Sequence, residues 1–308
     1  MTAALIVLSV IAIFTLRLRS ATLMPFKKIA TSLEVGPGGL SKEVLCTGAR
    51  SLLLCSNHAA KYVNLERKWW QHRLANDSDY TSFLGRRHDT CALLGSSYSL
   101  MKRKYGVDID AHDVVVRIND PPVRGYETHV GRRPADISFF NMALPKKRCV
   151  RPPHNRSVLV QCSFAGDHPT ATKKSTSNAE CAKVAWDRFG VKTFVMSEYV
   201  FLIARRALEY ERVHKSTKSV LLKPSCGFRS VIFMLHLCRN LHLYGFGGTT
   251  ANEPYKYYSN VSTSFSYETA LHDFAGEKRF IDAFASGKLD RTEFDLSWDG
   301  IGKLIVHE

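Results

Sequence analysis

A Gly-Ser-Ser turn at Gly95, Ser96 and Ser97 follows the apolar run Cys91–Leu94. A strand that ends in a Gly/Ser turn can present backbone N–H groups to a phosphate or a ribose. The turn is not a Walker loop, because no Gly-Lys-Ser/Thr sequence follows it. We therefore expect this turn to contact a nucleotide, although the turn alone is a weak signal.

The pair Asp108-Ile109-Asp110 has the spacing of a metal-binding carboxylate pair. Oxygen ligands of this kind suit Mg²⁺ or Mn²⁺. The pair, however, lies in the polar segment YGVDIDAHD, before the apolar run Val114–Ile118 begins. These surroundings favour a surface turn or a helix cap over a metal site.

The segment Lys223–Gly227 precedes an amphipathic helix that we expect at Phe228–Arg239. Ser225 is a natural N-cap residue, and Gly227 allows a ligand to approach closely. The free N–H groups at the start of such a helix attract a phosphate or a carboxylate, although ordinary capping explains the same residues equally well.

His272 lies just before another expected helix, in the sequence HDFAGE that ends at Glu277. A single histidine is more often structural than catalytic. Histidine is nevertheless the side chain best suited to take a proton from an alcohol near neutral pH, so His272 is a candidate general base.

Short apolar runs that alternate with helical patterns must position these residues. Because the runs are apolar on both faces, they favour a sheet covered by helices on both sides. The predicted class is therefore α/β, with one Rossmann-like domain whose ligands bind at the carboxyl ends of the strands. Strands are expected at Cys91–Leu94, Val114–Ile118, Asp136–Phe140, Val158–Gln161, Thr193–Met196, Leu241–Phe246 and Leu304–Val306, and helices at Glu180–Phe189, Val200–His214, Phe228–Arg239 and Glu277–Ser286.

The chain has 308 residues, with 43 Lys and Arg against 28 Asp and Glu, so its net charge is +15. This excess suits an anionic partner, such as a nucleic acid, an anionic membrane or an acidic sugar nucleotide. Nucleic-acid binding usually requires a dense basic run interleaved with aromatic residues. The basic residues here are scattered, which argues against a nucleic-acid partner.

The first 16 residues are almost wholly apolar and are followed by Arg17 and Arg19. As a helix they would extend roughly 23 Å, which is short for a bilayer core of about 30 Å. We favour a signal-anchor over a cleavable signal peptide, because no small-x-small cleavage site follows. We expect residues 17–44 to form a linker or stem that contains VGPGG, and residues 45–308 to form the folded domain, with helical spacing at about 45–85.

Eight cysteines occur without a C-x-x-C pair or zinc-like spacing. Three N-x-S/T sequons occur, at Asn76, Asn155 and Asn260. Together with the apolar N-terminus they favour the secretory pathway, where disulfides form.

Taken together in order, these motifs resemble those of the sialyltransferase family over roughly residues 89–285. Four motifs in the family's order and spacing are a highly specific signal. Cys91–Asp136 resembles the large sialyl motif, Pro224–Gly247 the small motif, Lys256–Ser259 motif III, and His272–Glu277 the very-small motif His-x4-Glu.

The resemblance implies a metal-independent, inverting glycosyltransferase with a variant GT-A fold and a CMP-linked acidic sugar as the donor. His272 matches the general base, and Asn119 matches a residue that contacts the nucleotide. The Asp-x-Asp pair matches a segment that binds no metal, and no cofactor is expected. The positions that match the donor site are Gly95, Ser96, Ser97, Asn119, Ser225, Cys226, Gly227 and Tyr257.

The resemblance also implies structural roles. Cys91 and Cys238 match a disulfide that joins the large and small motifs, and Glu277 matches a structural or orienting partner. The cellular setting that follows is a single-pass type II Golgi membrane protein with a luminal catalytic domain that acts on a glycan of a glycoprotein or glycolipid.

Three residues depart from the family pattern. Ser96 stands where the family usually has Asn, Cys226 replaces a hydroxyl residue, and Lys256 replaces a His. A lysine can still pair with a phosphate or a carboxylate. These changes leave two alternatives to sialic acid transfer, namely transfer of another CMP-activated keto-sugar acid such as Kdo, or a non-catalytic homologue.

Overall fold

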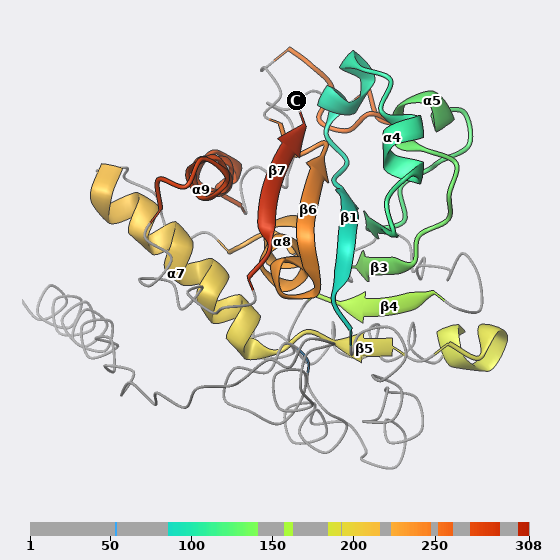
Figure 1. Ribbon diagram of the computed structural model, residues 1–308, viewed down its shortest axis with the longest axis horizontal. Helices are drawn as coiled ribbons and strands as arrows, with labels where there is room; N and C mark the ends of the chain where they lie inside the picture. Colours follow the sequence, from blue (N-terminus) through green and yellow to red (C-terminus); the bar gives the residue numbers. More distant parts are fainter. Residues whose placement is uncertain are drawn as a thin grey trace, which may run out of the picture. The chain divides into compact units, whose positions relative to one another are not determined.

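The computed structural model describes residues 53, 86–140, 157–162, 184–191, 193–215, 223–247, 252–260, 272–289 and 301–307, coloured in Figure 1. All of them fall within one compact unit, Val35–Glu308. The expected anchor, the linker, nearly all of the helical segment at 45–85, and the sequons at Asn76 and Asn155 lie outside the described residues. No helix among the described ranges is both long and apolar enough to cross a membrane.

The centre of the domain is a seven-stranded sheet in which every neighbouring pair of strands is parallel. The strand order is β5-β4-β3-β2-β1-β6-β7. The strands are β1 (His88–Leu94), β2 (Val114–Ile118), β3 (Ile137–Phe140), β4 (Val158–Gln161), β5 (Thr193–Val195), β6 (Cys238–Tyr244) and β7 (Lys303–His307). The sequence predicted all seven, and the α/β class is confirmed.

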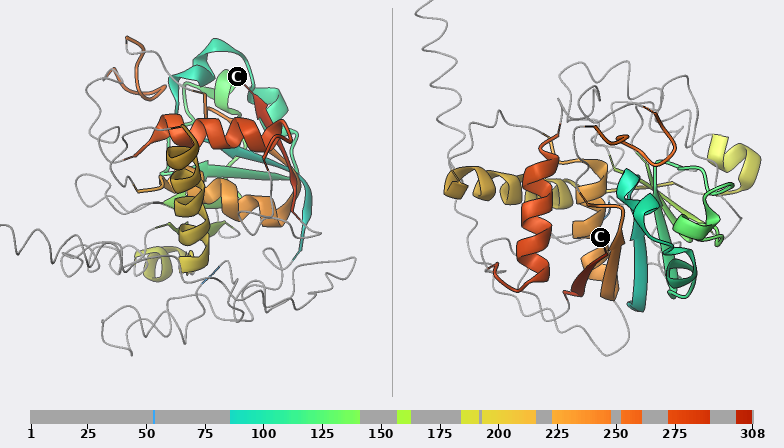
Figure 2. Two further views of the ribbon diagram at one scale, coloured as in Figure 1. Left: turned by 90° about the vertical axis from the view of Figure 1, so that its left-hand side faces the viewer. Right: turned by 90° about the horizontal axis from the view of Figure 1, so that it is seen from above.

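Helices cover both faces of the sheet, as the continuous apolar runs predicted. Leu93 and Val116 belong to a large core shared with three helices, whereas Ala92 and Val115 face a smaller core on the opposite side. Figures 1 and 2 show the large helices on one side and the short ones on the other. The large helices are α7 (Glu198–Lys215), α8 (Cys226–Leu237) and α9 (Phe274–Ala285), and the short ones are η3 (Tyr98–Lys102), α4 (Gly106–Asp110) and α5 (Glu127–Val130).

The order of the strands reverses at β1. Strands β2 to β5 follow one another away from one edge of β1, whereas β6 and β7 lie along its other edge. The carboxyl ends of β1 and β6 therefore lie at a topological switch point, which is where α/β sheets bind ligands. The region outside these two strand ends is called the crevice below. The disulfide Cys91–Cys238 joins these two strands, as the sialyltransferase resemblance implied.

Candidate functional site

The turns that follow β1 and β6 pack directly against each other at the switch point. The Gly95 N–H donates to Tyr244 O (2.8 Å), and the Ser97 N–H donates to Gly245 O (3.3 Å). The Ser97 hydroxyl donates to Gly247 O (3.0 Å) and accepts from the Ser99 N–H (3.2 Å), so it caps η3. The turns at residues 95–97 and 245–247 are thus hydrogen-bonded to each other beneath the crevice, and together they are called the floor below.

The turn was expected to offer its backbone N–H groups to a nucleotide. The N–H groups of Gly95 and Ser97 are bonded to Tyr244 O and Gly245 O, which leaves the N–H group of Ser96 for such a contact. Gly95 is required for a different reason, since a Cβ atom there would lie 2.4 Å from Gly245 O. Glycine at this position permits the close approach of two backbones.

Gly95→Ala is expected to lower the free energy of unfolding by about 1–3 kcal/mol, because the backbone oxygen of Gly245 cannot move without disturbing β6. Urea denaturation would measure the change. Gly227→Ala is the matched control, because a Cβ there would meet nothing closer than 3.5 Å. Equal urea midpoints for Gly95→Ala and the wild type would contradict the packing argument.

The segment around Lys256 and Tyr257 lies beside the turn after β1. Lys256 forms an antiparallel bridge with Ser97, and the Tyr257 N–H donates to Ser96 O (3.1 Å). The Tyr257 ring is buried, which raises the pKa of its phenol, and its hydroxyl donates to Pro122 O (2.6 Å). Tyr257 therefore packs against the turn after β1, and its hydroxyl is bonded within the protein. Lys256 lies next to the predicted donor-binding residues.

Asn119 and Asp120 follow the carboxyl end of β2, on the same side of the sheet as the turns after β1 and β6. Both adopt the left-handed conformation, with φ of 62° and 51°. Consecutive non-glycine residues in this region are uncommon, although Asn and Asp tolerate it better than other residues do. Such conformations concentrate at ligand sites, which supports the prediction that Asn119 contacts the nucleotide.

Helix α8 directs its N-terminus at this crevice. A Cβ on Gly227 would lie 3.5 Å from the Phe246 ring and 3.7 Å from the Ile118 side chain. Ser225 is the N-cap, as predicted, and its hydroxyl accepts from the Phe228 N–H (3.0 Å). Within the described part of the chain, the N–H groups of Cys226 and Gly227 have no hydrogen-bond partner. The start of this helix therefore offers two N–H groups that can bind an anion.

Glu277 is the buried partner of Ser225. Its carboxylate accepts the Ser225 N–H at Oε1 (2.6 Å) and the Ser225 hydroxyl at Oε2 (2.7 Å). Burial raises the pKa of Glu277 to about 7, against the lowering effect of these two hydrogen bonds. Glu277 therefore fixes both the backbone and the hydroxyl of the residue that caps α8, in line with its predicted structural role.

His272 contacts Lys223, which lies two residues before Ser225. Its Nδ1 lies 2.6 Å from Lys223 O. Because a carbonyl oxygen can only accept, Nδ1 must carry the proton in this bond, which leaves Nε2 as the basic nitrogen of the neutral ring. The segment 272–277 is thus bound to the segment 223–225 at two points, and it places a base beside the N-terminus of α8.

Cys226 is bonded to Cys162, at the carboxyl end of β4. The sulfur that the sequence placed at a hydroxyl position of the donor site is therefore part of a disulfide. Any contact of Cys226 with the donor would then involve its backbone N–H. The partner of Cys162 had been left open by the sequence.

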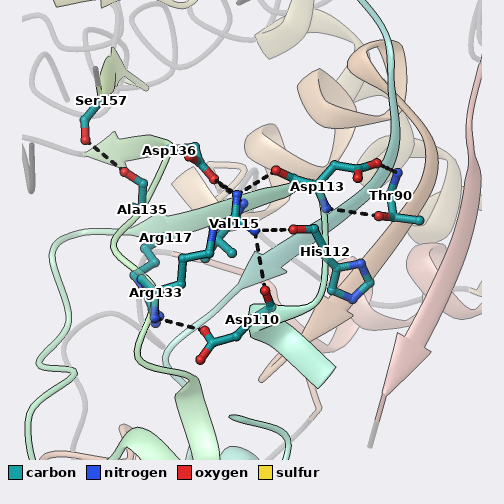
Figure 3. A network of polar contacts seen from close by, with 10 residues as sticks. All are labelled: Thr90, Asp110, His112, Asp113, Val115, Arg117, Arg133, Ala135, Asp136 and Ser157. Carbon is teal, nitrogen blue, oxygen red and sulfur yellow. Dashed lines mark hydrogen bonds and ion pairs between the residues drawn. The ribbon is translucent and has the colours of Figure 1, made fainter. Parts of the chain in front are cut away.

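Asp110 has a structural role, although it is the last residue of α4 and not the surface turn or helix cap that the sequence favoured. Its carboxylate accepts the backbone N–H groups of Arg132 (2.8 Å) and Arg133 (2.9 Å). Figure 3 shows the surrounding network, in which the Arg133 side chain also donates to Asp136 (2.9 Å). Asp108 is exposed on α4. No group of three or more His, Cys, Asp or Glu side chains in the described ranges could hold a metal ion.

Sequence reasoning missed two contributors to the site. Lys223 acts through its backbone oxygen, which leaves no signal in residue type. Arg229 is 4% exposed and donates to Cys162 O. A single arginine within the apolar run FRSVIFMLHL could have indicated it, because arginine is rarely buried without a partner.

Curated relatives of this chain are glycosyltransferases from animals and plants. The chain is 26% identical over 206 residues to CMP-N-acetylneuraminate-beta-galactosamide-alpha-2,3-sialyltransferase 1 of Gallus gallus, which covers 66% of this chain and 57% of that protein. It is 26% identical over 230 residues to sialyltransferase-like protein 2 of Oryza sativa subsp. indica, covering 66% and 54%. A beta-1,6-galactosyltransferase of Arabidopsis thaliana is 23% identical over 217 residues, covering 64% and 51%. The chain spans little more than half the length of these relatives.

Among solved structures, a mammalian sialyltransferase crystal structure matches with 21% identity and a TM-score of 0.48, covering 83% of this chain and 89% of that one. The family model for glycosyltransferase family 29 (sialyltransferase) matches residues 55–289. Because that match covers most of the chain, this protein belongs to glycosyltransferase family 29, the sialyltransferase family.

Proposed function

We propose that this protein transfers sialic acid from CMP-sialic acid to a hydroxyl of a glycan acceptor, with inversion at the anomeric carbon and without a metal ion. The observation that carries the proposal is the hydrogen bond from His272 Nδ1 to Lys223 O. It leaves Nε2 able to accept a proton, and it holds His272 against Lys223, two residues before the cap of α8.

The reaction needs little beyond a base and a donor held in place. As the acceptor oxygen forms its bond to the anomeric carbon, its proton passes to His272 Nε2. The bond between that carbon and the phosphate oxygen breaks, and CMP leaves with the electron pair. Attack on the face opposite CMP inverts the configuration. CMP is a good leaving group, so the reaction does not require a strong general acid.

The donor is an anion, and the groups around the crevice suit one. In the proposal, the N–H groups of Cys226 and Gly227 bind a phosphate or carboxylate oxygen at the positive end of α8. Lys256 lies beside Ser97 and can supply a compensating charge. The net charge of +15 would also steer the donor toward the protein.

Two observations support a different sugar as the second candidate. Ser96 stands where the family usually has an asparagine, and one relative is named as a beta-1,6-galactosyltransferase. The alternatives are therefore transfer of Kdo from CMP-Kdo, transfer of galactose, or donor binding without turnover.

The proposed setting is the Golgi lumen, with residues 1–16 as a type II membrane anchor and 17–44 as a stem. Asn260, one of the three sequons, is exposed, as an N-glycan acceptor must be. The acceptor in this proposal is a glycan on a glycoprotein or glycolipid, and no nucleic acid takes part.

The test is release of the donor's nucleotide by residues 45–308, secreted with their disulfides intact and assayed in EDTA. CMP-sialic acid, CMP-Kdo and an activated galactose would be offered with galactose- and N-acetylgalactosamine-terminated acceptors. We expect turnover of CMP-sialic acid that EDTA does not reduce. Loss of turnover in EDTA would reject the metal-free mechanism, and turnover of another donor alone would reject sialic acid. Binding of CMP by a folded protein that turns over no donor would favour a non-catalytic homologue.

A further inference from the structure

We propose that the Cys162–Cys226 disulfide is a positioning device for the donor, which holds the N-terminal turn of α8 in its binding conformation before CMP arrives. This inference rests on the proposed function, because it assigns the bridge a role in binding the CMP part of the donor.

Both ends of α8 are covalently attached to the sheet. At the N-terminal end, Cys226 is the first residue of the helix and is bonded to Cys162 at the end of β4. At the C-terminal end, Cys238 is the C-cap and is bonded to Cys91 in β1. Helix ends normally fray, because their first N–H groups have no partner within the helix. The N-terminal bridge opposes fraying at the residues that would bind the donor.

A buried arginine provides a second attachment at the same end. Arg229 Nη1 donates to Cys162 O, and Arg229 Nε lies 3.4 Å from Ser225 O. The guanidinium thus joins the last residue of the β4 segment to the cap of α8. It acts in parallel with the disulfide, which joins the same two segments.

The attachments converge on the residue that Glu277 also holds. Ser225 precedes Cys226 directly, and Glu277 accepts both its N–H and its hydroxyl. Each member of this cluster is at least nine-tenths buried: Cys162, Ser225, Cys226, Arg229 and Glu277. Three elements, β4, α8 and α9, therefore meet at a rigid point beneath the N–H groups of Cys226 and Gly227.

The expected consequence is a change in affinity rather than in the chemical step. If the first turn of α8 is formed for only part of the time, the apparent dissociation constant increases by the inverse of that fraction. Once the donor has bound, the site has the same arrangement with or without the bridge. Loss of the bridge should therefore raise KM for the donor and leave kcat nearly unchanged.

The experiment compares wild-type residues 45–308 with the double variant Cys162→Ser/Cys226→Ser. Peptide mapping without reduction would first establish that Cys162 and Cys226 are linked in the wild type. CMP binding would be measured by calorimetry, and donor turnover would be measured below the melting temperature of the variant. We expect KM for the donor and Kd for CMP to rise about threefold to tenfold, with kcat within about twofold of the wild type. Unlinked cysteines, or an unchanged Kd and KM, would overturn the proposal.

A matched control separates positioning from general stability. Val114→Ala removes two buried methyl groups at the amino end of β2, away from the crevice. It should lower the melting temperature without changing Kd for CMP, and an equal loss of affinity in this control would also overturn the proposal. If the double variant fails to fold, Arg229→Lys keeps the bridge and the charge but replaces the guanidinium, whose separate Nε and Nη1 donors reach the two carbonyls, with a single ammonium. It should raise Kd for CMP about two- to threefold, and no change would overturn the proposal.

The controls also distinguish this inference from the proposed function. A wild-type protein that binds no CMP and turns over no donor would reject the function itself. A wild-type protein that does both, with unchanged constants in the bridge variant, would reject only the role of the bridge.

Discussion

His272→Ala is expected to reduce the rate of sugar transfer by about 10²–10⁴-fold, the usual contribution of a general base. The alanine variant has no group to take the proton from the acceptor hydroxyl. Binding of CMP should change little, because the groups proposed to bind the donor lie on α8 and on the turns after β1, β2 and β6. Measurement of kcat with saturating donor, together with calorimetry of CMP binding, would check both parts.

The matched control is His272→Asn. Its side-chain amide can still donate to Lys223 O, as His272 Nδ1 does (2.6 Å), but it offers no basic nitrogen at the second position. We expect this variant to be as slow as His272→Ala and to have a melting temperature nearer to that of the wild type. A fast His272→Asn variant would show that the ring serves to hold the loop rather than to accept a proton.

The strands could be predicted because each contains a short apolar run, and β2, β3, β4 and β5 are buried on both faces. Val114–Ile118 and Val158–Gln161 have the predicted bounds. The carboxyl ends of several other strands were less well placed. The predicted strand Leu241–Phe246 begins at Cys238 and ends at Tyr244, because the turn that starts at Gly245, with a φ of +72°, packs against the turn after β1. That packing is a tertiary effect, which the periodicity of one strand cannot encode.

For the candidate site, the sequence identified the structural roles of two residues but not the contacts between them. Ser225 was identified as a cap and Glu277 as an orienting residue, yet 52 positions separate the two that bond directly. The N–H groups of Gly95 and Ser97 are engaged by Tyr244 O and Gly245 O because β1 pairs with β6. The Cys162–Cys226 bridge depends on where β4 ends. These features arise from strand order, and a single sequence carries no direct record of it.

The two contacts of the segment 272–277 have a mechanistic consequence. His272 bonds to Lys223, and Glu277 bonds to Ser225. The proposed base and the cap of α8 are therefore held by one short segment at the start of α9, which fixes the distance between them.

Glu277→Gln is expected to remove a pH dependence of stability that the wild type possesses. The pKa of Glu277 is raised from 4.5 to about 7, chiefly by burial. The folded protein therefore holds this proton more tightly than the unfolded chain does. The resulting stability is complete below about pH 4.5 and is lost as the pH rises toward 7, by about 3 kcal/mol. Glutamine has nearly the same shape and does not ionise, so its contribution should not vary with pH.

Urea denaturation of both proteins between pH 4.5 and 8 would test this prediction. Two histidines titrate in the same range with the opposite sign, since desolvation lowers the pKa of the buried His236 and the half-buried His242 to about 4. Their effect is common to both proteins and cancels in the difference. The stability of Glu277→Gln relative to the wild type should therefore rise by about 3 kcal/mol over this range, and a constant difference would contradict a buried, proton-binding carboxyl.

Glu277→Ala separates the effect of the proton on Glu277 from the effect of its two hydrogen bonds to Ser225. Alanine leaves the Ser225 N–H and hydroxyl without their buried acceptor, which costs about 1–3 kcal/mol for each group. That loss should persist at pH 4.5, where Glu277→Gln and the wild type are expected to be similarly stable. Because Ser225 caps the helix that faces the donor, Glu277→Ala should also weaken CMP binding, whereas Glu277→Gln can still accept the Ser225 N–H and should retain most of it.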